Sequence, residues 1–194
     1  VLGGYDARAY AERSIWVRAR DGESIPVSLV YKKGAPLESM PMFITGYGAY
    51  EISTDPAFSV ARVSMLDRGV LYAVPHVRGG GEMGRAWYET GRRLNKKHTF
   101  EDFVDATAAL QDCGLADPAR TVANGGSAGG LLMGAVANLA PERYAGIEAD
   151  VPFVDALTTM LDPSLPLTVT EWDEWGDPLH DVEAYRYMRG YSPY

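Results

Sequence analysis

The order of apolar segments along the chain constrains its fold more than any other sequence feature. Short runs with strand-like spacing alternate with longer runs of helical spacing over most of the 194 residues. Two period-two runs flank Asp21-Gly22 and predict a β-hairpin near the start of the chain. Strands that alternate with helices form parallel sheets through right-handed crossovers. We therefore expect an α/β fold with a mostly parallel sheet and helices on both faces.

The expected elements follow from these runs. Strands are predicted at residues 15–20, 25–31, 41–45, 70–74, 121–123 and 146–151, and helices at 59–68, 99–113 and 128–139. Gly69 is expected to end the first helix, because glycine accepts a left-handed conformation there. Thr99 is expected to cap the second helix with its hydroxyl. A turn at Asp117-Pro118 is expected before the next strand.

Composition excludes several classes of protein. A 46% share of hydrophobic residues and 23% of charged residues fits one globular domain and excludes a disordered or collagen-like chain. The single cysteine, Cys113, fits a reducing compartment, and no apolar stretch reaches the length of a membrane span, so a cytoplasmic protein is expected. Three histidines without ligand spacing indicate no zinc site, and no other metal or cofactor is expected.

Acidic residues concentrate in one segment of the chain. Between Glu142 and Glu183 there are 11 acidic residues and one arginine, a net charge of −10 in a chain whose formal charge is −8. Such a segment repels phosphate groups, which argues against nucleic-acid and membrane partners, and it is compatible with a cationic ligand. A solvated acidic face is the simpler interpretation.

The segment with the clearest chemistry is a glycine-rich turn around Ser127. Gly125-x-Ser127-x-Gly129 lies between a predicted strand and a predicted helix, which is the context of a nucleophile elbow. There we expect Ser127 to have a positive φ and to expose its hydroxyl above the sheet. The Ala128 N–H, at the helix N-terminus, is then a candidate donor to an oxyanion. The alternative is a glycine-rich turn with an incidental serine.

A second oxyanion donor normally comes from the loop after an earlier strand. Gly46-Tyr47-Gly48 occupies that place, and its tyrosine hydroxyl could donate a hydrogen bond. Another glycine-rich segment, residues 79–84, satisfies the dinucleotide fingerprint G-x-G-x-x-G. That fingerprint also needs an acidic residue about 20 positions later at the end of a second strand. Glu101 and Asp102 fall in a predicted helix instead, so we interpret residues 79–84 as a tight loop beside the pocket expected at Ser127.

Several short blocks occur in a fixed order along the chain: Gly46-Tyr47-Gly48, residues 76–82, 126–130, 151–155, 158–162, 174–176 and Tyr191-Ser192-Pro193-Tyr194. Together they resemble the prolyl oligopeptidase family of serine peptidases and, within it, the oligopeptidase B branch. The resemblance runs from about residue 14 to 194. It implies a partial α/β-hydrolase domain, with its C-terminal part missing, that cleaves short peptides after Arg or Lys. Residues 1–13 would be a linker or the remnant of a preceding propeller domain.

The resemblance also implies roles for single residues. Ser127 matches the nucleophile, and Tyr47 and the Ala128 N–H match the oxyanion donors. Glu171 and Asp173 match the acidic positions that receive a basic side chain at the cleavage site.

A further acidic position, Asp55, matches the first of two acids associated with a second basic residue of the substrate. The second of those positions is Ala57, which departs from the family pattern. The resemblance therefore leaves open whether the enzyme prefers paired basic residues.

Part of the catalytic triad is missing from the sequence. In this fold the triad follows the order Ser, Asp or Glu, His, and the only histidine after Ser127 is His180, in an acidic loop that contains a proline. The family's Asp and His lie beyond a motif like residues 191–194. We expect these 194 residues alone to be inactive, with short basic peptides as substrate and the rest of the enzyme as partner. A carboxylesterase on the same fold and a non-catalytic acidic binding module stay open as alternatives.

Overall fold

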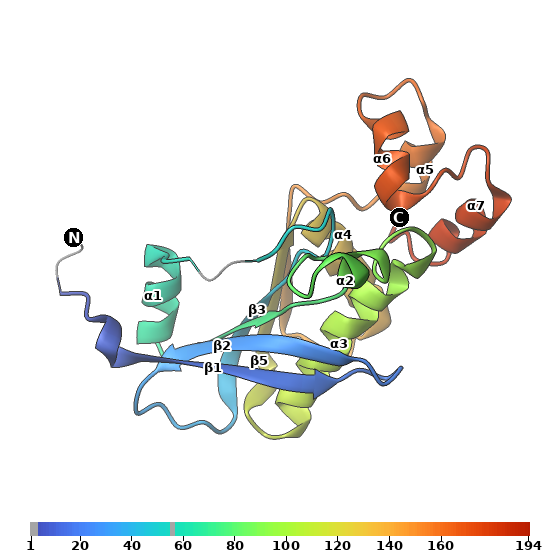
Figure 1. The fold of residues 1–194 in the computed structure, drawn as a ribbon. Coiled ribbons are helices and arrows are strands. Elements are labelled where there is room, and N and C mark those ends of the chain that lie inside the picture. The colour runs from blue at the N-terminus through green and yellow to red at the C-terminus, as the bar shows by residue number, and fades with distance from the viewer. Residues whose placement is uncertain (1–3, 55–56) are drawn as a thin grey trace.

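The centre of the molecule is a six-stranded sheet with the order β1-β2-β4-β3-β5-β6 (Figure 1). The structure, a computed structural model, describes residues 4–54 and 57–194. The strands are β1 (Tyr10–Arg18), β2 (Ser24–Lys32), β3 (Met40–Thr45), β4 (Leu71–Pro75), β5 (Ala116–Gly126) and β6 (Gly146–Asp150). Strands β1, β2 and β4 pair antiparallel, whereas β4, β3, β5 and β6 run parallel. The predicted hairpin and the mostly parallel sheet are confirmed.

Helices cover both faces of the sheet, as predicted. They are α1 (Val60–Asp67), α2 (Arg85–Glu89), α3 (Lys97–Asp112), α4 (Ala128–Leu139), α5 (Ala156–Leu161), α6 (Thr168–Trp175) and α7 (Val182–Arg189). Phe103 of α3 and Leu132 of α4 share the larger core with Ile44 of β3. On the opposite face, Leu66 of α1 packs with Tyr72 and Val74 of β4. Because alternate β4 side chains enter the two cores, this strand is apolar on both faces.

Two local predictions at the ends of elements are wrong. Thr99 is not a helix cap: α3 begins at Lys97, and the buried Thr99 hydroxyl donates to the carbonyls of Arg78 (2.7 Å) and Gly91 (3.1 Å). The hydroxyl thus serves a tertiary contact that local sequence does not reveal. Asp117-Pro118 does not precede β5 but lies within it, in a bulge where Met40 pairs with Ala116 and Met42 with Thr121.

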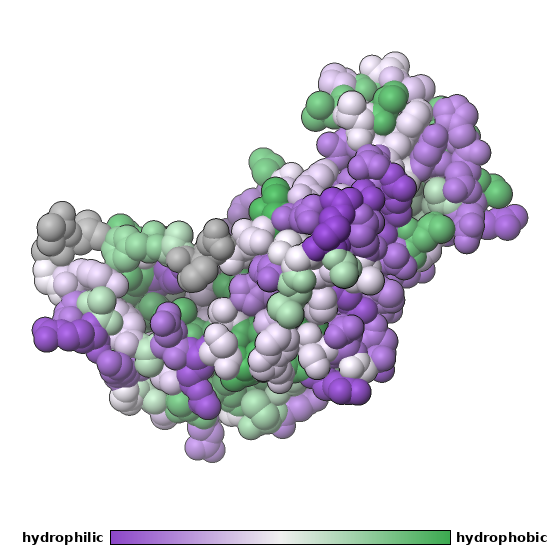
Figure 2. Space-filling model, viewed as in Figure 1, coloured by the Kyte–Doolittle hydropathy of each residue, from purple (hydrophilic) through white to green (hydrophobic). Residues whose placement is uncertain are grey.

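The first and last parts of the chain add details that were not predicted. β1 begins at Tyr10, so the expected division between residues 13 and 14 falls inside a strand. Helices α5, α6 and α7 follow the sheet and form the protruding red and orange part of Figure 1, on whose surface hydrophilic and hydrophobic residues are mixed (Figure 2). No helix within the described ranges combines the length and apolarity needed to cross a membrane.

Candidate active site

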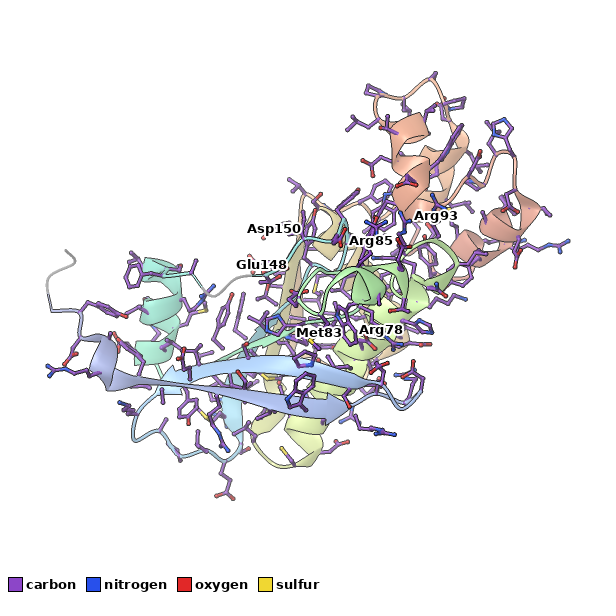
Figure 3. The ribbon with its side chains drawn as sticks, viewed as in Figure 1. Arg78, Met83, Arg85, Arg93, Glu148 and Asp150 are labelled. Carbon is purple, nitrogen blue, oxygen red and sulfur yellow. The ribbon has the colours of Figure 1, made fainter. Side chains whose placement is uncertain are left out.

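Ser127 sits at the turn between β5, which ends at Gly126, and α4, which begins at Ala128. Its backbone has φ 57° and ψ −115°, a strained conformation for a residue with a side chain. Two hydrogen bonds hold it there: the Ser127 N–H donates to the Asp150 carbonyl (2.9 Å), and the Phe153 N–H donates to the Ser127 carbonyl (3.1 Å). The predicted positive φ is confirmed, and the side chain is exposed. Figure 3 labels Asp150 at the end of the neighbouring strand.

Glycines allow the strand and the helix to approach closely at this turn. A Cβ atom at Gly125 would collide with the carbonyl oxygen of Gly129, and one at Gly129 would lie 2.6 Å from the carbonyl oxygen of Gly46. A side chain at either position would therefore push the turn apart. The second contact also seats the loop that carries Tyr47 directly against the start of α4.

Two groups beside Ser127 can donate to an oxyanion. Burial raises the pKa of Tyr47, while a hydrogen bond with the Ser127 side chain works in the opposite direction. The Tyr47 phenol therefore stays protonated, close to the serine hydroxyl. The Ala128 N–H is the first of helix α4, and it donates to no acceptor within the described part of the chain. The structure thus brings Ser127, Tyr47 and Ala128 together.

A cavity of about 320 Å³ opens beside the Ser127 side chain. Its wall is largely aromatic and apolar, and its carboxylate comes from Glu171 of α6. The Trp175 ring lies 5.6 Å from the Tyr50 ring and 5.5 Å from the Phe153 ring. The lining residues are Tyr50, Ser127, Ala128, Val151, Pro152, Phe153, Thr159, Met160, Pro166, Leu167, Thr168, Glu171 and Trp175.

Glu171 lies in this cavity with only neutral hydrogen-bond donors. Its Oε2 atom accepts from the Tyr50 hydroxyl (2.5 Å) and from Trp175 Nε1 (2.9 Å). Burial and then the Glu171 carboxylate raise the pKa of Tyr50, so the phenol remains a donor. No lysine or arginine of the described ranges pairs with Glu171. The cavity therefore presents a negative charge without a counterion, beside aromatic rings that also attract cations.

Asp173 lies elsewhere, although it is only two positions from Glu171. Its carboxylate pairs with Arg92 (3.1 Å) and with Arg93, and its side chain is 71% exposed. It lines a separate cavity of about 460 Å³ with Leu94 and Arg93, which Figure 3 labels. Residues two apart project from nearly opposite sides of a helix. The structure therefore brings Glu171 to the Ser127 cavity and leaves Asp173 outside it.

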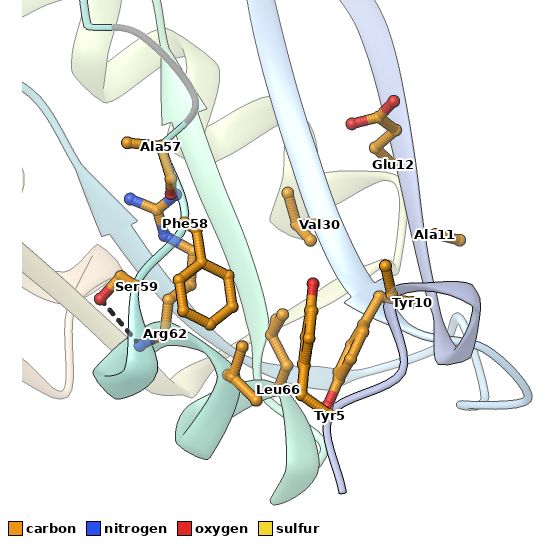
Figure 4. Close-up of a pocket in the computed structure, with 12 residues that line it drawn as sticks. Tyr5, Tyr10, Ala11, Glu12, Val30, Ala57, Phe58, Ser59, Arg62 and Leu66 are labelled. Carbon is orange, nitrogen blue, oxygen red and sulfur yellow. Dashed lines mark hydrogen bonds between the residues drawn. The ribbon is translucent and has the colours of Figure 1, made fainter. Parts of the chain in front are cut away.

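Asp55 lies outside the described residues. The chain is described again from Ala57, which is exposed and lines a third cavity of about 420 Å³ beside α1. Phe58 and Arg62 line it with Tyr5 and Tyr10 (Figure 4). This cavity shares no lining residue with the one beside Ser127.

None of the three histidines, all of them described, hydrogen-bonds to Ser127. His180 is exposed and pairs through Nδ1 with Asp177 (2.8 Å). His76 hydrogen-bonds to Ser28 of β2 (2.8 Å) and to Glu82 (3.3 Å). No group of three His, Cys, Asp or Glu side chains within the described ranges could hold a metal ion.

Two charged residues that the structure buries near Tyr47 have no role predicted from the sequence. Glu174 is 3% exposed and accepts from the Tyr50 N–H (3.0 Å) and the Tyr88 hydroxyl (2.5 Å). Because no helix is predicted over these residues, the spacing of three between Glu171 and Glu174 did not indicate that they share a helix face. Lys96 is 1% exposed, and nothing in its sequence context distinguishes it from Lys97.

Residues 79–82 pack against the loop that follows Tyr47. A Cβ at Gly79 would collide with the Gly48 carbonyl oxygen, and one at Gly81 with that of Glu51. Glu82 accepts from the Thr54 N–H (2.9 Å). These glycines therefore serve close packing against residues 48–54.

Comparison with known proteins agrees with this geometry. The model of the "Prolyl oligopeptidase family" matches residues 56–194. Dipeptidyl aminopeptidase BI of Pseudoxanthomonas mexicana is 54% identical over 98% of the chain, and Protease 2 of Moraxella lacunata is 47% identical over all of it. The chain spans 27% and 28% of the lengths of these two relatives.

Solved structures show the same fold. Oligopeptidase B from Leishmania major matches with a TM-score of 0.95 and 46% identity, over 98% of this chain and 27% of that one. Oligopeptidase B from Trypanosoma brucei with covalently bound antipain matches with the same TM-score and identity. The six-stranded sheet with its helices thus corresponds to part of the α/β-hydrolase domain of oligopeptidase B. The chain belongs to the prolyl oligopeptidase family.

Proposed function

We propose that this chain supplies the nucleophile and the substrate-recognition cavity of a longer serine peptidase that cleaves short peptides after Arg or Lys. The observation that carries the proposal is the Glu171 carboxylate in the same cavity as Ser127, with no cation paired to it among the described residues. The family relationship supports the reaction type, and the charge of the cavity supports the side chain that it selects.

In the proposed reaction, Ser127 attacks the scissile carbonyl carbon and forms an acyl-enzyme, which water then hydrolyses. The Tyr47 hydroxyl and the Ala128 N–H donate to the oxyanion that develops at each step. The general base and its carboxylate come from parts of the longer protein outside these 194 residues, as does a propeller domain. These residues alone are therefore expected to hydrolyse peptides negligibly.

The geometry around Glu171 suits a guanidinium or ammonium group. Both donors to this carboxylate use Oε2, which leaves Oε1 without a partner among the described residues. A charge-assisted contact of this kind contributes about 1.5–3 kcal/mol. The aromatic rings of Tyr50, Phe153 and Trp175 cover the stem of the side chain and exclude water.

The test uses the complete protein and two peptide amides that differ only in Arg or citrulline before the cleaved bond. Citrulline has the shape of arginine without its charge. We expect the wild type to prefer Arg about 10- to 100-fold in kcat/KM, and Glu171→Gln to lose that preference. The matched control is Asp173→Asn, on the same helix but outside the cavity, which should keep it.

Ser127→Ala should abolish turnover of both peptides. Equal rates on Arg and citrulline, or faster hydrolysis of a neutral acyl ester than of the Arg amide, would overturn the proposed specificity in favour of a carboxylesterase. Salt-sensitive binding of basic peptides without any turnover would instead indicate a binding module.

A further inference from the structure

Lys96 is one of the largest side chains that the fold buries completely. Its Nζ donates to the Gly48 carbonyl (2.5 Å), and it lies 5.1 Å from the centre of the Trp175 ring and 6.0 Å from that of Phe100. No carboxylate of the described residues forms an ion pair with it. A buried ammonium with one hydrogen bond is unfavourable for folding, so a role in the Tyr47 loop offers a reason for its presence.

The carbonyl that Lys96 holds belongs to the residue directly after Tyr47. Gly48 has φ +69°, and a Cβ there would collide with the side chains of Thr99 and Val77, so the loop packs closely against these residues at this point. The Lys96 ammonium satisfies this buried carbonyl. Without it, the carbonyl would be an unsatisfied buried acceptor, and the loop would relax toward another arrangement.

Neighbouring contacts fix the far side of the same loop. Glu174 accepts from the Tyr50 N–H, and Trp175, which carries the Lys96 ammonium over its ring, donates to Glu171. The loop between Gly46 and Tyr50 is thus held at Gly48 by a cation and at Tyr50 by a carboxylate.

We propose that Lys96 is a positioning residue for the oxyanion site: through the Gly48 carbonyl it holds the Tyr47 hydroxyl where the oxyanion forms. The inference rests on the proposed peptidase function. Because Lys96 touches neither substrate nor Ser127, its effect should fall on transition-state stabilisation and spare the binding of the basic side chain.

The experiment compares Lys96→Met with the wild type in the complete protein. Methionine fills much of the same volume but has neither charge nor donor. We expect kcat for the Arg amide to fall about 10- to 100-fold, the effect of a small displacement of a catalytic group. The affinity for an arginine aldehyde, which forms a tetrahedral adduct, should fall in parallel. The affinity for benzamidine, a cation that needs no oxyanion donor, should stay within about twofold of wild type.

A second variant avoids any change to the core. Replacing Ala49 by lactic acid turns the Gly48–Ala49 peptide into an ester, whose carbonyl is a weaker acceptor. The Ala49 N–H donates to no acceptor in the described residues, so the carbonyl is the only hydrogen-bonding group affected. We expect a smaller loss of kcat and of affinity for the arginine aldehyde than in Lys96→Met, again with unchanged affinity for benzamidine. Lys97→Met is the matched control: its ammonium lies over the Tyr187 ring (5.1 Å), and its kcat should equal that of the wild type.

Unchanged kcat in Lys96→Met or in the ester variant would overturn the inference. So would a parallel loss of kcat and benzamidine affinity, which would indicate a general loss of structure. A wild type that fails to cleave the Arg amide would refute the peptidase function itself, and the inference with it.

Discussion

Ser127 keeps an unfavourable backbone conformation because hydrogen bonds from neighbouring residues hold both its N–H and its carbonyl. The Asp150 carbonyl holds its N–H, and the N–H groups of Phe153, Gly130 and Leu131 all donate to its carbonyl. Strain at a single residue persists when the surroundings fix it in this way. Backbone contacts therefore fix the conformation in which Ser127 exposes its side chain.

Tyr47 should affect the rate of the reaction and not the binding of substrate. In Tyr47→Phe of the complete protein, we expect kcat to fall about 100- to 1000-fold with a nearly unchanged KM, because in the proposed reaction the phenol donates to the oxyanion, which is absent from the bound substrate. Steady-state kinetics with the Arg amide measures both. Tyr144→Phe, which removes a hydroxyl bound to Thr107 (3.1 Å), should leave kcat unchanged. A rise in KM alone would contradict the assignment.

Lys96 should make stability depend on pH above neutrality. Burial lowers the pKa of its ammonium to about 8 from the ordinary 10.5, and Glu174 opposes this only in part. Between these values the unfolded chain binds more protons than the native one at this position, so native stability rises with pH there. Between pH 8 and 10.5, the free energy of unfolding of the wild type should therefore rise by up to about 3 kcal/mol relative to that of Lys96→Met. Thermal unfolding of both proteins across this range measures the difference, and a constant difference would contradict it.

Sequence reasoning at single positions succeeded where chemistry and local pattern coincide. Ser127 combines a nucleophile with the glycine spacing of an elbow, and its positive φ was predicted from that spacing. Lys96 and Glu174 were missed because their burial comes from contacts with residues 48–50, more than 45 positions away in sequence. Local pattern carries no information about such contacts.

At the scale of elements, helix α6 directs Glu171 and Asp173 to different sites, although both were predicted to receive the same substrate side chain. Its inner side carries Glu171, Glu174 and Trp175 toward the Tyr50 loop, whereas Asp173 faces Arg92 and Arg93. Burial alone would raise the pKa of Asp173, but Arg93 and Arg92 outweigh it and hold the pKa below its usual value. The helical period explains this division, yet no helix is predicted at 168–175 from the sequence. Its short length, with 8 residues, gave too few apolar positions to show a period.

The loop at residues 79–82 should be as important to activity as it is to stability. Gly79→Ala adds a Cβ where the Gly48 carbonyl lies and a side chain at φ +96°, so it should displace the Tyr47 loop. We expect kcat of the complete protein to fall at least about tenfold. Gly34→Ala, at φ +81° in open space, is the control: it should destabilise by about 1–3 kcal/mol through backbone strain and leave kcat unchanged. Equal kinetics for the two variants would contradict this role of Gly79.

Across the whole molecule, a buried ion pair joins segments that lie far apart in sequence. Asp102 of α3 is 0% exposed and accepts from the Arg78 N–H (3.0 Å) and from its guanidinium (2.9 and 2.5 Å). Burial opposes the charge on Arg78, but Asp102 and Asp21 outweigh it and raise the pKa of the guanidinium. Asp21, at the hairpin turn, binds the same arginine (2.6 Å). The pair thus connects the hairpin, the end of β4 and helix α3.

Breaking this pair should destabilise the fold. Asp102→Ala leaves Arg78 buried without its main partner, and a loss of about 3–5 kcal/mol is expected. Asp117→Ala, which removes an exposed pair with Arg120 (2.8 Å), should change stability by at most about 1 kcal/mol. Denaturant unfolding of the complete protein compares them. A similar small effect of both would show that the buried pair contributes little.

The structure assigns different positions to acidic residues of the segment between Glu142 and Glu183. Of its 11 acidic residues, Glu171 faces the Ser127 cavity, Glu174 supports the loop and Asp173 pairs with arginines. The sequence could predict the excess of charge and its fit to a cationic ligand. It could not predict which carboxylate would face the cavity, because that depends on how α6 packs against the loop that follows β3.

The proposed function requires above all that Ser127 is a reactive nucleophile. The complete protein can be treated with a fluorophosphonate, which phosphonylates activated serines, and digested, and the site of the added mass located by mass spectrometry. We expect one phosphonyl group on the peptide that contains Ser127, slower labelling in the presence of an Arg peptide, and no labelling in Ser127→Ala. A protein that turns over Arg peptides while Ser127 stays unlabelled, or that carries the label on another residue, would contradict it.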